Sequence, residues 1–162
     1  MRLLRHLLAS HAVTRWRFSR AVTAAIEQAV TAAELRTSGE IRFAIETDLT
    51  LPELQAGKAP RERAIEVFAE LGVWDSELRN GVLIYVLMAD RDVEIVADRA
   101  AAARIPLSDW ESACRLMEGH FRDGRFQEGS VAGVAAVAAL LEKHFPARAI
   151  ERNEQPNQPS LL

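Results

Sequence analysis

The residues with the clearest capacity for chemistry are carboxylates and an amide at the ends of predicted strands. Glu40 comes directly before the first predicted strand, Asn80 just before the second, and Asp98 directly after the third. If the first two strands are parallel and the third is antiparallel to them, these side chains emerge at one edge of the sheet, which Asp109 at the start of a later helix can reach. Hard cations bind oxygen ligands from several short segments. We therefore predict a calcium or magnesium site made by Glu40, Asn80, Asp98 and Asp109.

These residues also have a simpler interpretation. Acidic and amide side chains are common in solvated turns and helix caps, where they bind no ligand. The sequence leaves both interpretations open. A second acidic group, made of Asp48, Asp90 and Asp92, is expected at the opposite edge of the same sheet.

Other kinds of active site are excluded by the residues themselves. Gly124 and Gly129 have the spacing of a phosphate-binding loop, but Ser130 follows where such a loop needs a lysine. Cys114 lies within an apolar helical stripe, which favours a small buried hydrophobe over a nucleophile. The four histidines have no metal-ligand spacing, and no serine stands in a glycine-flanked turn.

Apolar periodicity predicts the elements that would position the candidate residues. Alternation and continuous apolar runs indicate strands, and apolar residues three or four apart indicate helices. The predicted elements are a helix over Ser19–Arg36, strands over Ile41–Thr47, Val82–Met88 and Val93–Ala97, a helix beginning at Pro60, a helix with a capping box at Ser108, and a helix over Gln127–His144. Asp48–Ala59 is predicted to be a polar loop and Ala89–Arg91 a hairpin turn. Together they predict an α/β fold, a three-layer α/β/α sandwich on a small mixed β-sheet.

The chain has a length typical of one domain with tails. We expect a basic amphipathic segment at residues 1–20, an α/β domain over residues 19–146 and a disordered polar tail at residues 147–162. A net charge of −3 argues against a nucleic-acid binder. No apolar run is long enough to span a bilayer, and Arg5 and His6 interrupt the N-terminal leucines, which makes a poor secretory signal. We therefore expect the protein in the cytoplasm.

The first twenty residues differ from the rest of the chain in charge. They contain five arginines and no acidic residue, and Leu3, Leu4, Leu7 and Leu8 fall on one side of a helix. Such a segment is typical of a helix that contacts an anionic membrane surface or an acidic protein partner. The alternative is a terminal helix whose leucines pack on the protein's own sheet.

Short segments of the chain occur in a specific order: Ser38-Gly39-Glu40-Ile41, Phe68 with Leu71-Gly72-Val73-Trp74, Asn80-Gly81-Val82-Leu83-Ile84, Asp90-Arg91 with Val93-Glu94-Ile95, Asp109, and Phe121-Arg122-Asp123-Gly124 with Gly129. Through these segments the chain resembles, over about residues 38–145, the TPM-domain family, a phosphatase-like domain of thylakoid-lumen and bacterial proteins. The resemblance implies the same α/β/α sandwich that the periodicity predicts. Members of the family have been associated with acid phosphatase activity and calcium binding, and others are membrane-anchored accessory proteins without an assigned reaction.

Two departures from the family pattern affect the predicted site. The family commonly has Asp-Asn-Gly before the buried strand, where this chain has Arg79-Asn80-Gly81. After the third strand the family usually has a glycine-rich turn and an acidic residue, where this chain has Ala97-Asp98-Arg99-Ala100. Arg79 and Arg99 would weaken cation binding by repulsion and would favour an anion such as phosphate.

Two functions are compatible with this sequence. We favour a non-catalytic accessory or interaction module, with a divalent cation as an optional ligand, that acts at the inner membrane face or on an unidentified protein partner through residues 1–20. The alternative is a divalent-metal-dependent, acid-phosphatase-like hydrolase, in which the four candidate residues hold an ion that polarises a phosphoryl oxygen and activates water. The preference rests on two observations: no nucleophile has an adjacent base, and two arginines lie at the predicted metal edge.

Overall fold

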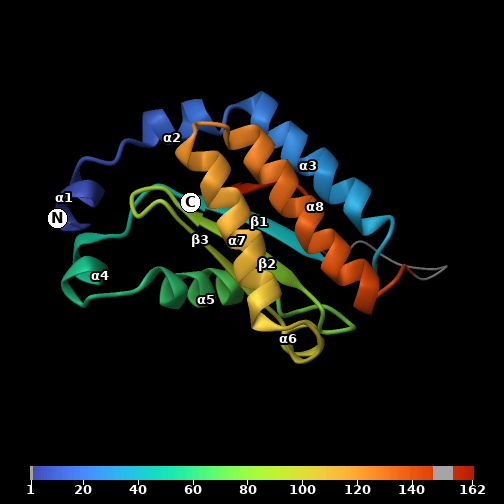
Figure 1. Cartoon of the computed structure of the whole chain (residues 1–162). Helices are drawn as coiled ribbons and strands as arrows, with labels where there is room; N and C mark the ends of the chain where they lie inside the picture. Colours follow the sequence, from blue (N-terminus) through green and yellow to red (C-terminus); the bar gives the residue numbers. More distant parts are fainter. Residues whose placement is uncertain (1, 148–154) are drawn as a thin grey trace.

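The computed structural model describes residues 2–147 and 155–162 of the chain (Figure 1). Its elements, in chain order, are α1 (Arg2–Leu7), α2 (His11–Arg17), α3 (Arg20–Glu34), β1 (Ile41–Glu46), α4 (Leu51–Gln55), α5 (Pro60–Glu70), β2 (Val82–Leu87), β3 (Asp92–Ala97), α6 (Arg99–Arg104), α7 (Leu107–Arg122), α8 (Phe126–His144) and β4 (Ser160–Leu161). None of these helices combines the length and the apolar character needed to traverse a bilayer.

A mixed sheet in the order β3-β2-β1-β4 forms the middle layer of the described structure. β1 and β2 are parallel, with Ile41 opposite Val82, and β2 and β3 form an antiparallel hairpin, with Val82 opposite Ala97. Every residue of β2 is buried, because this strand has a neighbour on each side and helices over both faces. β3 is an edge strand. The predicted parallel pair and hairpin are confirmed.

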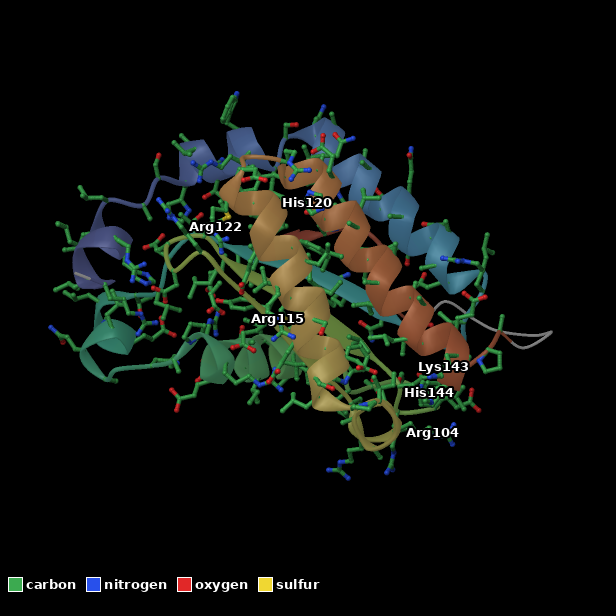
Figure 2. The ribbon with its side chains drawn as sticks, viewed as in Figure 1. Arg104, Arg115, His120, Arg122, Lys143 and His144 are labelled. Atoms are coloured by element: carbon green, nitrogen blue, oxygen red, sulfur yellow. The ribbon has the colours of Figure 1, made fainter. Side chains whose placement is uncertain are left out.

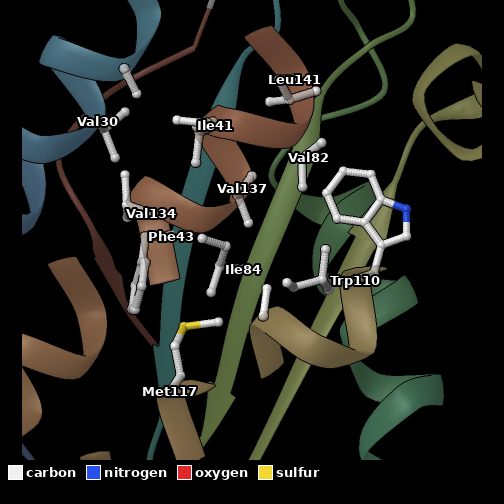
Figure 3. Close-up of a cluster of buried hydrophobic side chains, with 14 of the residues drawn as sticks. Val30, Ile41, Phe43, Val82, Ile84, Trp110, Met117, Val134, Val137 and Leu141 are labelled. Carbon is white, nitrogen blue, oxygen red and sulfur yellow. The ribbon is translucent and has the colours of Figure 1, made fainter. Parts of the chain in front are cut away.

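Helices cover both faces of this sheet, which confirms the predicted α/β/α sandwich. α3, α7 and α8 cover one face, and α8 lies between the other two (Figure 1). Figure 3 shows Met117 of α7 and Val137 of α8 directed toward Ile84 in β2, within the larger hydrophobic core. α5 covers the opposite face, where Val67 joins Leu83 in the smaller core. These helices cover the faces of the sheet and not its two rims, where the strands begin and end.

Two short helices and one helix start differ from the predictions. The predicted loop Asp48–Ala59 contains α4, because the Glu53 carboxylate accepts a hydrogen bond from the Thr50 amide at 2.8 Å and caps the first turn. α6 was not predicted, and it begins directly after Asp98. The predicted capping box at Ser108 is wrong, because α7 begins at Leu107 with Pro106 at its N-cap.

The predicted disordered tail is wrong at its end. Ser160 and Leu161 form β4, which pairs in parallel with β1. The Arg42 side chain holds this segment by donating hydrogen bonds to the Pro156 carbonyl at 2.6 Å and to the Ser160 hydroxyl at 2.7 Å. Backbone pairing and a side-chain anchor therefore order a segment that has little apolar surface to bury. The part of the predicted tail at residues 148–154 lies outside the described residues.

Candidate functional site

Three of the four candidate residues lie at one rim of the sheet. The strand register puts the start of β1, the start of β2 and the end of β3 side by side. Two backbone hydrogen bonds continue this register beyond the strands, from the Val82 amide to the Glu40 carbonyl at 2.8 Å and from the Asp98 amide to the Gly81 carbonyl at 2.8 Å. Glu40, Asn80 and Asp98 are therefore neighbours in space, although they come from separate parts of the sequence.

Asn80 has an oxygen that is buried without a partner. Its side chain is 1% exposed, and its Nδ2 donates to the Ser38 carbonyl at 2.8 Å. Its Oδ1 is buried and accepts no hydrogen bond from the residues that the structure describes. A Cβ on the next residue, Gly81, would lie 2.2 Å from the Val73 carbonyl oxygen, so only glycine permits this close approach. An unsatisfied buried acceptor costs free energy, which a cation or a water molecule would recover.

Asp98 presents a second acceptor of the same kind. It is 7% exposed, and its Oδ1 accepts a hydrogen bond from the Arg99 amide at 2.6 Å, at the start of α6. Its Oδ2 is buried, and within the described chain it has no hydrogen-bond partner. The side chain thus caps a helix with one oxygen and leaves the other available at the rim.

Glu40 pairs with a carboxyl group that the sequence analysis missed. Burial and, after it, the negative charge of Glu40 raise the pKa of Glu34 to about 8. Glu34 Oε1 also accepts a hydrogen bond from the Ile41 amide at 3.3 Å. At neutral pH this pair therefore retains a proton on Glu34. The only feature of the sequence that could have indicated this pair is the break at Thr37–Gly39, where the chain turns back on itself and brings Glu34 and Glu40 together.

Asp109 is not brought to the other three residues by any contact that the structure describes. It is half-buried in the first turn of α7, where its Oδ1 lies 3.5 Å from the Ser108 hydroxyl and its amide donates to the Pro106 carbonyl at 3.0 Å. These contacts are local to the start of the helix. They do not involve Glu40, Asn80 or Asp98, so the place of Asp109 in the predicted site stays a prediction.

A cavity of about 530 Å³ lies beside the rim. Its lining residues come from the segment after α5 and from the start of α6, and they are Trp74, Asp75, Ser76, Glu77, Arg79, Asp98 and Arg99. Acidic and basic side chains are mixed in this lining. Arg79 and Arg99, which the sequence analysis expected near the site, do line it, and their positive charges partly offset the negative charges of the three acidic residues in the lining.

The residues present fit a divalent cation in part. Asn80 and Asp98 each supply a buried oxygen acceptor without a partner, which suits a hard cation. Within residues 2–147 and 155–162, however, no group of three or more His, Cys, Asp or Glu side chains is arranged to hold a metal ion. The calcium or magnesium site at Glu40, Asn80, Asp98 and Asp109 therefore stays a prediction.

Cys114 has no role as a nucleophile. Its thiol is half-buried in α7. Burial and, after it, the nearby negative charges of Glu94 and Glu118 raise the pKa of this thiol to about 12. The thiol therefore stays protonated at neutral pH, and a protonated thiol is neither nucleophile nor metal ligand.

The acidic residues at the opposite rim hold the N-terminal segment. Asp90 Oδ2 lies 2.7 Å from Arg2 Nη2, and Asp90 Oδ1 lies 3.2 Å from His6 Nε2. His6 Nδ1 accepts a hydrogen bond from the Leu49 amide at 3.0 Å. Burial alone would raise the pKa of Asp90, but the hydrogen bonds from Arg2 and His6 outweigh it and lower the pKa. Asp48 similarly lies 3.3 Å from the His11 imidazole.

This anchoring turns the apolar side of α1 outward. His6 is 2% exposed, whereas the leucines of the segment are 46–73% exposed; they are Leu3, Leu4, Leu7 and Leu8. Trp16 in α2 is 78% exposed. The alternative prediction, in which the leucines pack on the protein's own sheet, is wrong, because Arg2 and His6 occupy the inner side of α1. The outer side is an apolar surface flanked by arginines.

Comparisons with known proteins agree with this architecture. Among solved structures the chain is similar to the NMR structure of the BA42 protein from the psychrophilic bacterium Bizionia argentinensis, with a TM-score of 0.76 and 30% identity over 88% of this chain and 94% of that chain. It is also similar to the NMR structure of an N-terminal domain from P. gingivalis, with a TM-score of 0.54 and 20% identity over 80% of this chain and 82% of that chain, a likeness of fold alone. A comparison with curated proteins finds no match.

The family comparison covers most of the ordered chain. The family model for the TPM domain matches residues 16–140, a range that runs from α2 to α8 and includes the strands β1, β2 and β3. The chain therefore belongs to the TPM-domain family.

Proposed function

We propose that this chain is a non-catalytic accessory module that binds the anionic inner face of a membrane through residues 2–17. The observation that supports it is the inverted packing of α1, in which Arg2 and His6 point inward, whereas three leucines of the helix and Leu8 directly after it are exposed. A surface helix of a water-soluble domain ordinarily buries its leucines and exposes its charges. The inverted arrangement suits a second apolar phase, and the hydrocarbon boundary of a bilayer is such a phase.

The energetics of the segment favour binding at a lipid surface. Complete burial of a leucine side chain contributes about 1.5–3 kcal/mol. Each basic residue near an anionic bilayer adds about 1 kcal/mol, and Arg5, Arg15 and Arg17 are exposed on the same two helices. The ion pair with Asp90 holds α1 before binding, which lowers the entropy cost of ordering it at the surface.

Vesicle binding by leucine variants tests this proposal. Leu7→Asp and Leu8→Asp place a charge on the outward side of the segment without disturbing the core, since these leucines are 63% and 73% exposed. We expect each change to weaken sedimentation with phosphatidylglycerol vesicles about tenfold or more. Leu35→Asp is the matched control, because Leu35 is 78% exposed but lies just after α3.

Three outcomes decide the proposal. Loss of binding in the two N-terminal variants with full binding of the Leu35 variant supports it. Absence of binding by the unaltered protein refutes it. Equal binding by all three variants refutes it as well, because the apolar side of α1 would then make no contact with lipid.

A second candidate function is divalent cation binding at the rim. It is supported by the two buried acceptor oxygens of Asn80 and Asp98. Asp98→Asn removes the charge but keeps a side-chain oxygen that can cap α6. We expect calcium to raise the Tm of the unaltered protein and to have little effect on this variant. Asp123→Asn, at an exposed site on the C-terminal side of α7, is the control, and an equal rise of Tm in all three proteins would exclude the rim site.

A further inference from the structure

We infer that a second cavity, at the end of the sheet opposite the rim, binds the phosphate group of an organic phosphate. The inference goes beyond the proposed function and does not require it. The cavity measures about 370 Å³. It lies between the end of β2, the turn before β3, the C-terminal half of α7 and the first residues of α8, and α2 contributes one side chain.

Three arginines from separate segments face this cavity. Arg17 comes from α2, Arg91 from the turn between β2 and β3, and Arg122 from the last turn of α7, as Figure 2 shows for Arg122. Glu118 is the one acidic residue in the lining. Arg91 adopts a left-handed backbone conformation with φ of 57°. Positive charge is therefore in excess at the cavity, because the fold brings together arginines that lie far apart in the sequence.

The three guanidinium groups are available for a ligand. In the described part of the chain, none of them lies within ion-pair distance of a carboxylate, whereas Arg2, Arg63 and other arginines are paired. Guanidinium groups bind phosphate oxygens through two parallel hydrogen bonds, and arginines from several directions can surround a tetrahedral anion. α8 adds a favourable field, since it begins beside the cavity and its N-cap residue makes no side-chain cap hydrogen bond.

The rest of the lining suits an apolar group attached to the phosphate. The Phe121 and Phe126 rings are stacked with centroids 5.3 Å apart, and the Arg17 guanidinium lies 5.0 Å from the Phe126 centroid. Val86 and Met88 complete the apolar part of the wall. A cavity that combines excess positive charge with an aromatic wall fits a phosphate ester better than inorganic phosphate.

The phosphate ester can come from two sources. The headgroup of an anionic phospholipid and a soluble organic phosphate share the same chemistry at this cavity. Arg17 belongs to α2, which also carries the exposed Trp16, so the cavity opens beside the segment for which membrane binding is proposed. Vesicle binding by arginine variants separates the two sources.

Titration of the full chain with phenyl phosphate, followed by amide chemical shifts, tests the inference. We expect phenyl phosphate to cause saturable changes in the amide chemical shifts of Gly124 and Phe126, and phenol to cause none. The binding of phenyl phosphate should weaken as the salt concentration rises. Combined replacement by Arg91→Gln and Arg122→Gln should weaken phenyl phosphate binding about tenfold or more, because two charge-assisted contacts are lost. Arg115→Gln is the control, since Arg115 lies in the middle of α7 away from the cavity (Figure 2).

The outcomes separate this inference from the proposed function. The inference is overturned if phenyl phosphate causes no saturable shifts, or if the double variant binds it as tightly as the Arg115 variant does. Reduced binding of the double variant to phosphatidic acid vesicles as well identifies a lipid headgroup as the ligand, and unchanged vesicle binding identifies a soluble phosphate. Phenyl phosphate binding that persists in the Leu7 variant shows that the cavity functions even if membrane binding fails.

Discussion

Replacing Gly133 by alanine tests the packing of α8 on α7, the two long helices that frame the proposed phosphate cavity. A Cβ at Gly133 would lie 2.1 Å from Met117 Sδ and 2.4 Å from Met117 Cγ. Met117 is fully buried in the larger core, so its side chain has little room to move. The methyl group would therefore force the two helices apart or move Met117 from its place against the sheet.

Two opposing effects set the size of the change. Alanine favours a helix interior over glycine by about 1 kcal/mol. Overpacking a buried contact typically costs about 1–3 kcal/mol, and an overlap with two atoms of one buried side chain falls at the upper end. We expect a net loss of about 1–2 kcal/mol in the free energy of unfolding. For a chain of this length that corresponds to a Tm lowered by about 2–8 °C.

Gly119→Ala provides the matched control in the partner helix. A Cβ at Gly119 meets no atom within 4 Å, so this variant should gain about 0.5–1 kcal/mol from helix propensity alone. Urea unfolding of the two variants and the unaltered protein measures the difference. If Gly133→Ala is as stable as Gly119→Ala, then α7 and α8 do not make the close contact at Met117 that the structure shows.

Two further predictions concern buried ionisable groups. Because the pKa of Glu34 is raised to about 8, the folded state holds a proton that the unfolded state loses above about pH 4.5, so Glu34 lowers stability as the pH rises through this window. Glu34→Gln should remove that loss, so the free energy of unfolding of the variant, relative to the unaltered protein, should be higher at pH 8 than at pH 5 by about 1–2 kcal/mol after allowance for solvent screening. Chemical denaturation in EDTA at both pH values measures this difference. A difference that does not change with pH contradicts the prediction. Asp90→Asn should destabilise the protein by about 2 kcal/mol at pH 7 and expose α1 to proteolysis, because Arg2 and His6 lose a partly buried partner. Since the pKa of Asp90 is lowered, the destabilisation caused by Asp90→Asn should shrink as the pH falls below 4. If the variant and the unaltered protein are cleaved by protease at the same rate, Asp90 does not anchor α1.

Much of the fold was predictable because burial leaves a periodic pattern. β2 is covered on both faces and α8 is apolar over much of its circumference, so their sequences show where they lie. α4 and α6 were missed because each is a short helix beside a single capping carboxylate, Glu53 or Asp98. β4 was missed because Ser160–Leu161 is ordered by its pairing with β1, and such pairing leaves no local signal.

The position of a candidate site residue could be predicted only where the direction of its strand determines which rim it occupies. The parallel and antiparallel pairings alone place Glu40, Asn80 and Asp98 at one rim. The position of Asp109 depends on where α7 begins and how it rotates on the sheet, and helix periodicity determines neither. Glu34 could not be assigned to the rim from its own helix, because its partner Glu40 lies beyond a turn.

Side chains of the same chain occupy outward-facing backbone groups of the edge strand β3. The Val93 amide donates to the Glu118 carboxylate at 3.3 Å, and the Ile95 carbonyl accepts a hydrogen bond from the Arg61 guanidinium. These side chains occupy backbone groups with which a strand of another molecule would pair, and charged residues along an edge oppose aggregation. Burial and the charges of neighbouring acidic residues raise the pKa of Asp92, in the same strand, to about 6. Mild acid therefore removes part of this electrostatic protection, and intermolecular sheet formation should become easier as the pH falls toward 5.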